Sequence, residues 1–185
     1  MRIICRRHYD RTNIDLKKAE ENMDTVAVIV TYNRKDLLKE SIEALCGQTR
    51  PSDIMVVDNA STDGTEEMVR EIMASMPEHS GHGKIIYHNM GENLGGAGGF
   101  SFGVKQAYND GYKYIWLMDD DCIVKEDSLE ELFNADKKLE GDYGFLCSKV
   151  IWTDGSICKT NVQRYPMAKR IKDFDSELVR VNYAT

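Results

Sequence analysis

Short apolar segments alternate with amphipathic segments along residues 24–152. Continuous apolar runs rich in β-branched residues are typical of buried strands. Four such runs are Val26–Thr31, Ile54–Val57, Lys84–His88 and Tyr112–Met118. Between them, apolar residues recur every three or four positions, as in helices. Strands and helices that alternate with short connections predict an α/β fold, a Rossmann-like layered α/β/α arrangement whose central sheet is mostly parallel and covered on both faces.

Four helices are expected between and after these strands. The first spans Arg34–Gly47, and the second follows Asp63, which can cap it. The third follows the glycine run Gly95–Gly99, and the fourth begins at the capping box Ser128-x-x-Glu131. Their expected buried faces are, in order, Leu38, Ile42 and Leu45; Val69, Ile72, Met73 and Met76; Phe100, Val104, Ala107 and Tyr108; and Leu129, Leu132 and Phe133.

The pattern weakens towards the end of the chain. Residues 143–152 predict another strand, followed by a turn at Asp154-Gly155. No strong period is visible beyond Thr160. The fold prediction therefore depends on the four repeats that precede this region.

Polar clusters directly follow each of the four predicted strands. They are Thr31-Tyr32-Asn33-Arg34, Asp58–Gly64, His88–Gly99 and Asp119-Asp120-Asp121. In open parallel sheets, ligands bind at the carboxyl ends of the strands. We therefore expect the four clusters to form one binding site rather than four separate loops.

The three consecutive aspartates are the most informative of these clusters. Neighbouring like charges repel, so a fold usually keeps them where a cation or strong donor offsets the repulsion. Oxygen ligands suit Mg²⁺ or Mn²⁺, which one or two carboxylates commonly hold together with substrate phosphates. The aspartates thus predict a metal–diphosphate site, and the alternative is a solvated acidic loop.

Three further features can contact a nucleotide. The Asp58 carboxylate can accept the N3–H of uracil or thymine, although Asp is also common in turns. Arg34 can donate several hydrogen bonds to a diphosphate, or it can be a solvated side chain in the first helical turn. The glycine run can bring backbone N–H groups close to a ligand at a helix N-terminus. The chain lacks the dinucleotide fingerprint and the P-loop lysine, which disfavours those two sites.

Composition narrows the class of protein. The chain has 185 residues and a net charge of −7, which fits a single globular domain and argues against a nucleic-acid partner. No apolar run approaches the ~20 residues of a membrane span, and the basic start lacks the apolar stretch of a secretory signal. That start can still touch an anionic membrane surface. Five dispersed cysteines without a CxxC pair indicate reduced thiols. The expected location is therefore the cytoplasm, either free or peripheral at the membrane.

Four segments, in order and suitably spaced over about residues 24–152, carry a resemblance. They are Thr31–Arg34, Val56–Thr65, Asn93–Phe100 and Trp116–Asp121. Together they resemble the family 2 inverting glycosyltransferases of GT-A fold. The GGAGGF stretch most resembles the galactofuranosyl- and rhamnosyltransferase-like branch, whose members build cell-wall or other polysaccharides.

The resemblance implies transfer of a sugar, with inversion, from a UDP- or dTDP-sugar to a hydroxyl of a saccharide or lipid-linked acceptor. It implies that Asp119 and Asp121 bind Mg²⁺ or Mn²⁺ and that Asp58 holds the uracil or thymine. It also implies that Asn93 and the glycines border the ribose and donor sugar. The donor-binding residues implied in this way are Thr31, Tyr32, Asn33, Arg34, Asp58, Asn59, Asn93, Gly95, Gly96, Asp119 and Asp120.

The general base that an inverting transferase requires is not identified by the sequence. In the family this carboxylate follows the DXD motif, in the acceptor-binding half. The carboxylates available after Asp121 in segments without a family motif are Asp154, Asp173, Asp175 and Glu177. We expect the base to lie outside this chain. The expected division is a poorly ordered or peripheral leader (1–23), a nucleotide-sugar-binding domain (24–160) and the start of a truncated acceptor-side segment (161–185).

Two other functions stay open. A non-catalytic module that binds nucleotide sugars would share the donor site and need no base. A sugar-1-phosphate nucleotidyltransferase has a similar layered sheet but needs a glycine-rich basic loop after the first strand. This chain has Tyr32-Asn33-Arg34 there instead, which disfavours the nucleotidyltransferase.

Overall fold

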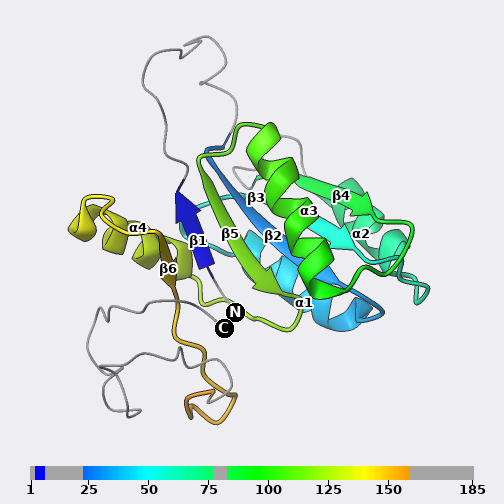
Figure 1. Ribbon diagram of the computed structural model, residues 1–185. Helices are drawn as coiled ribbons and strands as arrows, with labels where there is room; N and C mark the ends of the chain where they lie inside the picture. Colours follow the sequence, from blue (N-terminus) through cyan, green and yellow to red (C-terminus); the bar gives the residue numbers. More distant parts are fainter. Residues whose placement is uncertain (1–2, 7–22, 77–82, 159–185) are drawn as a thin grey trace.

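The computed structural model describes residues 3–6, 23–76 and 83–158, which form a layered α/β/α domain (Figure 1). Its six-stranded sheet has the order β4-β3-β2-β5-β1-β6. The four predicted strands are confirmed, and each is parallel to its neighbours among them. They are β2 (Thr25–Thr31), β3 (Asp53–Asp58), β4 (Ile85–Asn89) and β5 (Tyr114–Asp119).

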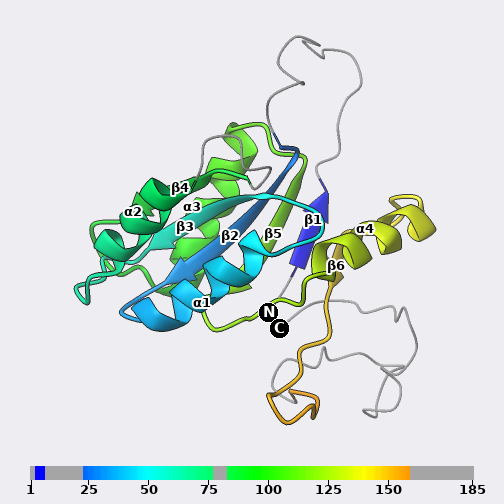
Figure 2. The same cartoon turned by 180° about the vertical axis from the view of Figure 1, so that it is seen from behind.

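The four predicted helices are also present, and they cover both faces of the sheet. They are α1 (Lys35–Cys46), α2 (Thr65–Ser75), α3 (Gly95–Asn109) and α4 (Ser128–Leu139). Helix α3 lies on one face (Figure 1), and the other three lie on the opposite face (Figure 2). Two apolar cores result, with alternate residues of β2 entering each: Ala27 and Ile29 face α1, whereas Val26 and Val28 face α3.

The buried face of helix α3 matches the predicted one only in part, since Ala107 is buried and Phe100 packs against the core. The residues against the sheet are Gly99, Gly103 and Ala107, whereas Val104 and Tyr108 are 37% and 52% exposed. A Cβ atom at Gly99 would lie 2.5 Å from Val30 Cγ1. The small residues let the helix backbone approach the sheet closely, so a pattern based on large apolar residues missed both glycines and wrongly included Val104 and Tyr108.

Both predicted capping arrangements differ in detail. Asp63 precedes Gly64, the N-cap of α2, and accepts hydrogen bonds from the N–H and Oγ1 of Thr65, but the N-cap itself makes no side-chain cap hydrogen bond. The box predicted at Ser128 is absent, because α4 begins at that residue and makes no side-chain cap at Asp127. In α2, Met68 and Val69 are buried while Met73 is exposed, which corrects the predicted stripe.

Two short strands extend the sheet beyond β5. Strand β1 (Ile3–Arg6) pairs antiparallel with β5 and with β6 (Phe145–Cys147). The sequence assigned Ile3–Arg6 to a peripheral leader, and this part of the expectation is corrected; residues 1–2 and 7–22 lie outside the described residues. Residues 143–152 yield only the three-residue β6 and a bridge between Ile151 and Ile157. The predicted turn at Asp154-Gly155 is confirmed.

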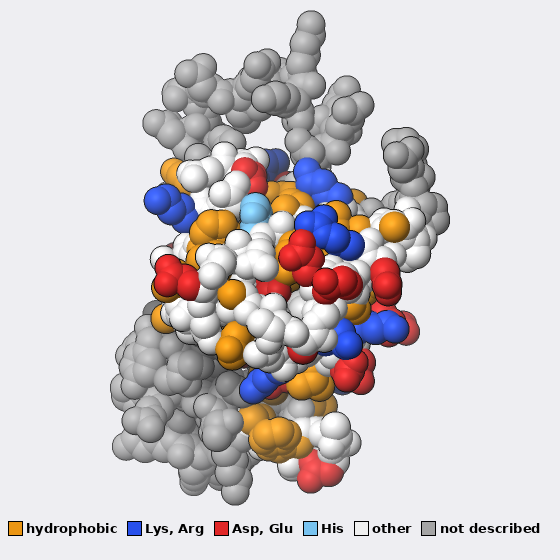
Figure 3. All heavy atoms as spheres, turned by 90° about the vertical axis from the view of Figure 1, so that its right-hand side faces the viewer, with side chains coloured by type: hydrophobic (Ala, Val, Ile, Leu, Met, Phe, Trp, Pro, Cys, Tyr) orange, Lys and Arg blue, Asp and Glu red, His pale blue; other side chains and the backbone are white. Residues whose placement is uncertain are grey.

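The side of the molecule that carries β4 and α2 faces the viewer in Figure 3. Acidic and basic side chains are interspersed there, and no extended basic surface is visible on this face. A nucleic-acid surface would require a basic patch or stripe. The face that Figure 3 shows carries no patch of this kind.

Candidate functional site

The carboxyl ends of the parallel strands bring the predicted clusters to one edge of the sheet. In the strand register, Thr31 lies opposite Asp58, and Val30 lies opposite Asp119. Asp58 in turn lies opposite Asn89 at the end of β4. The loops that follow these four strands therefore border one region, as the sequence predicted.

The three aspartates have different environments. Asp120 is 4% exposed and accepts a hydrogen bond of 2.8 Å from Thr31 Oγ1. Its backbone oxygen accepts another from Ser41 Oγ in α1, at 2.7 Å. Burial raises the pKa of the Asp120 carboxyl, and the hydrogen bond from Thr31 and the charge of Arg34 partly offset the rise. Asp120 therefore fixes the loop after β5 to β2 and α1.

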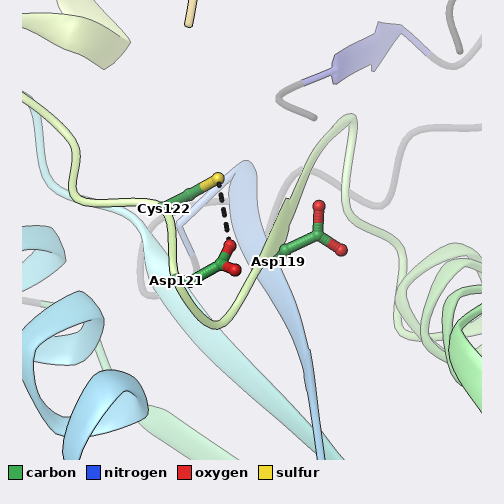
Figure 4. A group of neighbouring side chains, drawn as sticks. All are labelled: Asp119, Asp121 and Cys122. Atoms are coloured by element: carbon green, nitrogen blue, oxygen red, sulfur yellow. Dashed lines mark hydrogen bonds between the residues drawn. The ribbon is translucent and has the colours of Figure 1, made fainter. Parts of the chain in front are cut away.

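Asp119 and Asp121 flank this buried residue and are more accessible. Together with Cys122 they form a group in which one potential ligand atom from each residue lies within 4.8 Å of the others. Figure 4 shows the Cys122 thiol directed towards Asp121, with a distance of 3.9 Å between Sγ and Oδ1. Two carboxylates fit Mg²⁺ or Mn²⁺ together with substrate phosphates. The donor set therefore fits the predicted metal, and the buried thiol adds a softer neighbour.

Arg34 pairs with two of these aspartates. Its Nη1 lies 3.3 Å from Asp120 Oδ1 and 3.1 Å from Asp121 Oδ2. The Arg34 side chain is 52% exposed, so it contacts the aspartates from the solvent side. Arg34 thus lies beside the candidate metal group, a position from which it can donate hydrogen bonds to a diphosphate.

Asp58 is fully buried and already occupied by protein donors. Its Oδ1 accepts hydrogen bonds from Ser61 N and Ser61 Oγ, and its Oδ2 accepts one of 2.6 Å from the Tyr87 hydroxyl. Burial and the bond to Asp58 raise the pKa of the Tyr87 phenol. In this conformation Asp58 anchors the loop after β3 and presents no surface to a nucleobase.

Asn33 joins the loops after β2 and β3. Its N–H donates to Ser61 Oγ, and its Oδ1 accepts from Thr62 N, both at 2.8 Å. Asn33 has a positive φ of 51°, a left-handed conformation that Asn tolerates better than most residues. Asn33 lies at the sheet edge where the predicted clusters gather, and its contacts hold the two loops together. The neighbouring Tyr32 is 45% exposed at the same edge.

The start of α3 is fixed to β3 by Asn59. The buried Asn59 side chain donates to the Gly95 carbonyl and accepts from Leu94 N, at 3.3 Å in each case. Asn93 Oδ1 accepts a bond from Gly95 N. No atom lies within 4 Å of a Cβ built at Gly95 or Gly96 among the described residues, so the first turn of α3 is open to a ligand.

Ser41, Ser61 and Tyr87 support this site and were missed in the sequence. Ser61 lies inside the predicted cluster after β3, and this placement was the only available signal for it. Ser41 and Tyr87 lie within a helix and a strand, where a polar residue at a partly buried position gives no indication of its partner. Their contacts depend on the tertiary fold.

Among the candidate bases, only Asp154 lies within the described part of the chain. It is exposed in the turn that precedes Ser156, and hydrogen bonds from Ser156 lower the pKa of its carboxyl. A lowered pKa makes a carboxylate a weaker base. Asp173, Asp175 and Glu177 lie outside the described residues.

A comparison with protein families decides the classification. The model of the family "Glycosyl transferase family 2" matches residues 26–170. The chain belongs to this family. The match covers all four sequence clusters, confirms the resemblance noted in the sequence and sets aside the nucleotidyltransferase alternative.

Named relatives match the same region. The galactofuranosyltransferase GlfT1 of Mycobacterium tuberculosis is 42% identical over 97 residues, which cover 51% of this chain and 29% of the relative. The abequosyltransferase RfbV of Salmonella typhimurium is 36% identical over 104 residues, or 55% of this chain and 29% of the relative. The chain thus spans less than a third of the length of these relatives.

Solved structures confirm the GT-A fold. A mannosyltransferase from Pyrobaculum calidifontis, in complex with GDP-Man and Mn²⁺, is 25% identical with a TM-score of 0.51, covering 65% of this chain and 33% of that chain. TarS of S. aureus, in complex with UDP, is 20% identical with a TM-score of 0.54 and covers 64% of this chain and 33% of that chain. No helix in the described part of the chain combines the length and hydropathy needed to cross a bilayer.

Proposed function

We propose that this chain binds a nucleotide-sugar donor for a family 2 glycosyl transfer, with Mg²⁺ or Mn²⁺ held by Asp119 and Asp121. The observation that carries the proposal is the placement of this acidic pair and the open first turn of α3 at the same edge of the sheet. A helix N-terminus favours negative charge, and a metal held by carboxylates binds phosphate oxygens.

Different residues of the site would have separate roles in binding the donor and the metal. The first turn of α3, from Gly95 and Gly96, lies open where the donor sugar and ribose would pass. Thr31 fixes Asp120, and Asp120 in turn positions the loop that carries both metal ligands. The metal, when bound, would stabilise the negative charge that develops on the leaving diphosphate.

The identity of the nucleobase in the donor follows less directly from the structure. We propose a UDP- or dTDP-sugar, because Asp58 occupies the family position for uracil or thymine. Asp58 Oδ2 accepts one hydrogen bond, from Tyr87, and can accept a second, but the residue is fully buried, so contact with the N3–H would require the surrounding side chains to move. GDP belongs in any test, because the Pyrobaculum relative was solved with GDP-Man.

Transfer to an acceptor hydroxyl, with inversion, requires a general base in addition to the donor site. We propose that this base is supplied outside the residues described, for a saccharide or lipid-linked acceptor. A donor-binding module without catalysis is the second candidate. It is favoured by Asp154, an exposed turn carboxylate with a lowered pKa that is poorly suited to act as base.

Calorimetry tests the proposal directly. UDP, dTDP and GDP are titrated into the protein with Mn²⁺, with Mg²⁺ and with EDTA. We expect metal-dependent binding of UDP or dTDP in preference to GDP. Failure of every nucleoside diphosphate to bind would refute the proposal. An assay for free UDP detects donor hydrolysis or sugar transfer. Release of UDP would indicate an enzyme, whereas binding without release would indicate the non-catalytic module.

A further inference from the structure

Arg34 and the candidate metal share a ligand. The Arg34 guanidinium lies 3.1 Å from Asp121 Oδ2, and Asp121 is also one of the two carboxylates of the acidic pair with Asp119. A divalent cation bound to Asp121 and a guanidinium paired with the same carboxylate carry like charges at short range. Each therefore weakens the interaction of the other with Asp121.

The position of Arg34 allows it to change partner. The residue immediately precedes α1, and its side chain is about half exposed, as is that of Asp121. Both hydrogen bonds to the aspartates come from Nη1, and Nε and Nη2 make none to other described residues. The planar guanidinium thus retains donors suited to phosphate oxygens while Nη1 stays close to the buried Asp120.

We propose that Arg34 couples metal binding to nucleoside diphosphate binding, an inference that rests on the proposed function. Paired with Asp121, Arg34 lowers the affinity of the acidic pair for a metal alone. A diphosphate that arrives with the metal gives Arg34 a new anionic partner and frees Asp121. Because binding linkage is reciprocal, the metal must then raise nucleotide affinity by the same factor as the nucleotide raises metal affinity.

The test measures Mn²⁺ affinity by calorimetry, with and without saturating UDP, for the unaltered protein and Arg34→Gln. Lys35→Gln is the matched control, because it removes one positive charge at the adjacent position and its side chain lies near Gly64 rather than the aspartates. Arg34→Lys retains the charge and provides a second variant. Far-UV circular dichroism checks that each variant is folded.

For the unaltered protein we expect UDP to raise Mn²⁺ affinity at least about fivefold, within the usual range of coupling. Arg34→Gln should raise the affinity for Mn²⁺ alone by roughly two- to fivefold, the value of an exposed ion pair, and should reduce the coupling. Lys35→Gln should change the coupling little. Arg34→Lys should keep the affinity for Mn²⁺ alone near that of the unaltered protein.

The two proposals fail in different ways. If the unaltered protein binds UDP with Mn²⁺ but Arg34→Gln shows the same coupling, the role of Arg34 is refuted and donor binding stands. An equal effect of Lys35→Gln would also refute it, since general charge would then explain the result. If no nucleoside diphosphate binds the unaltered protein, the proposed function fails, and the coupling role fails with it.

Discussion

Replacing Gly103 with alanine should destabilise the protein by pushing α3 away from the sheet. A Cβ atom at this position would lie 2.5 Å from Val28 Cγ1 and 3.2 Å from Val57 Cγ2. Both valines are fully buried, in strands β2 and β3 of the sheet interior. Neither methyl group can move without disturbing its own packing, so the helix or a strand must shift.

The size of the effect follows from two opposing contributions. An additional methyl group in a tightly packed core costs roughly 1–3 kcal/mol. Alanine recovers about 1 kcal/mol relative to glycine in a helix interior. We therefore expect the free energy of unfolding to fall by up to about 2 kcal/mol, with overpacking as the larger contribution.

Equilibrium unfolding in urea, followed by circular dichroism, measures this difference. Gly96→Ala is the control, because its Cβ would have no atom within 4 Å among the described residues and its φ is not positive. That variant should be at least as stable as the unaltered protein, with up to about 1 kcal/mol gained from helix propensity. A Gly103→Ala protein as stable as Gly96→Ala would refute the close approach of α3 to the sheet.

Three further predictions concern the site and its supports. Asp121→Ala should abolish metal-dependent UDP affinity in calorimetry while the urea midpoint stays unchanged; retained affinity would contradict the metal role. Asn33→Gly should lower stability by about 0.5–1.5 kcal/mol, because the hydrogen bond from Thr62 N to Asn33 Oδ1 is lost while glycine keeps the backbone N–H bond to Ser61 Oγ and accepts the positive φ; an unchanged midpoint would contradict this. Burial and the bond to Asp53 raise the pKa of Tyr112, so stability present below its ordinary pKa of about 10 should be lost as pH rises above it. Tyr112→Phe should show a shallower alkaline decline in its urea midpoint, and an equal decline would contradict this assignment.

The sequence predicted the parallel sheet well because strands that are buried on both faces have a recognisable residue pattern. Strand β2 is buried at every position, and such a strand appears as a continuous apolar run. The edge elements left weaker traces. Strand β1 has four residues and β6 has three, and neither belongs to the repeated alternation of strands and helices along the chain. Their pairing depends on contacts between distant segments, which periodicity does not encode.

The sequence predicted the positions of the site residues more accurately than their hydrogen-bond partners. Asp58 and Asn33 do lie at the predicted edge, but protein groups use their hydrogen-bonding atoms. Residue type and spacing indicate where polar groups gather, whereas the partner of each group depends on side-chain direction. The same limit applies to α3, whose buried face consists of small residues that a hydrophobic pattern overlooks.

The arrangement of the aspartates explains how three consecutive carboxylates are tolerated. The middle one, Asp120, is buried against Thr31 and paired with Arg34, while Asp119 and Asp121 remain beside each other at the edge. Three carboxylates and one guanidinium leave two net negative charges in this cluster, which a single divalent cation neutralises. Without the cation, the same two negative charges would repel an anionic diphosphate. The charge of the cluster therefore favours nucleotide binding together with a metal over nucleotide binding alone, and a turn of Arg34 would bring its positive charge from Asp121 to the added phosphates.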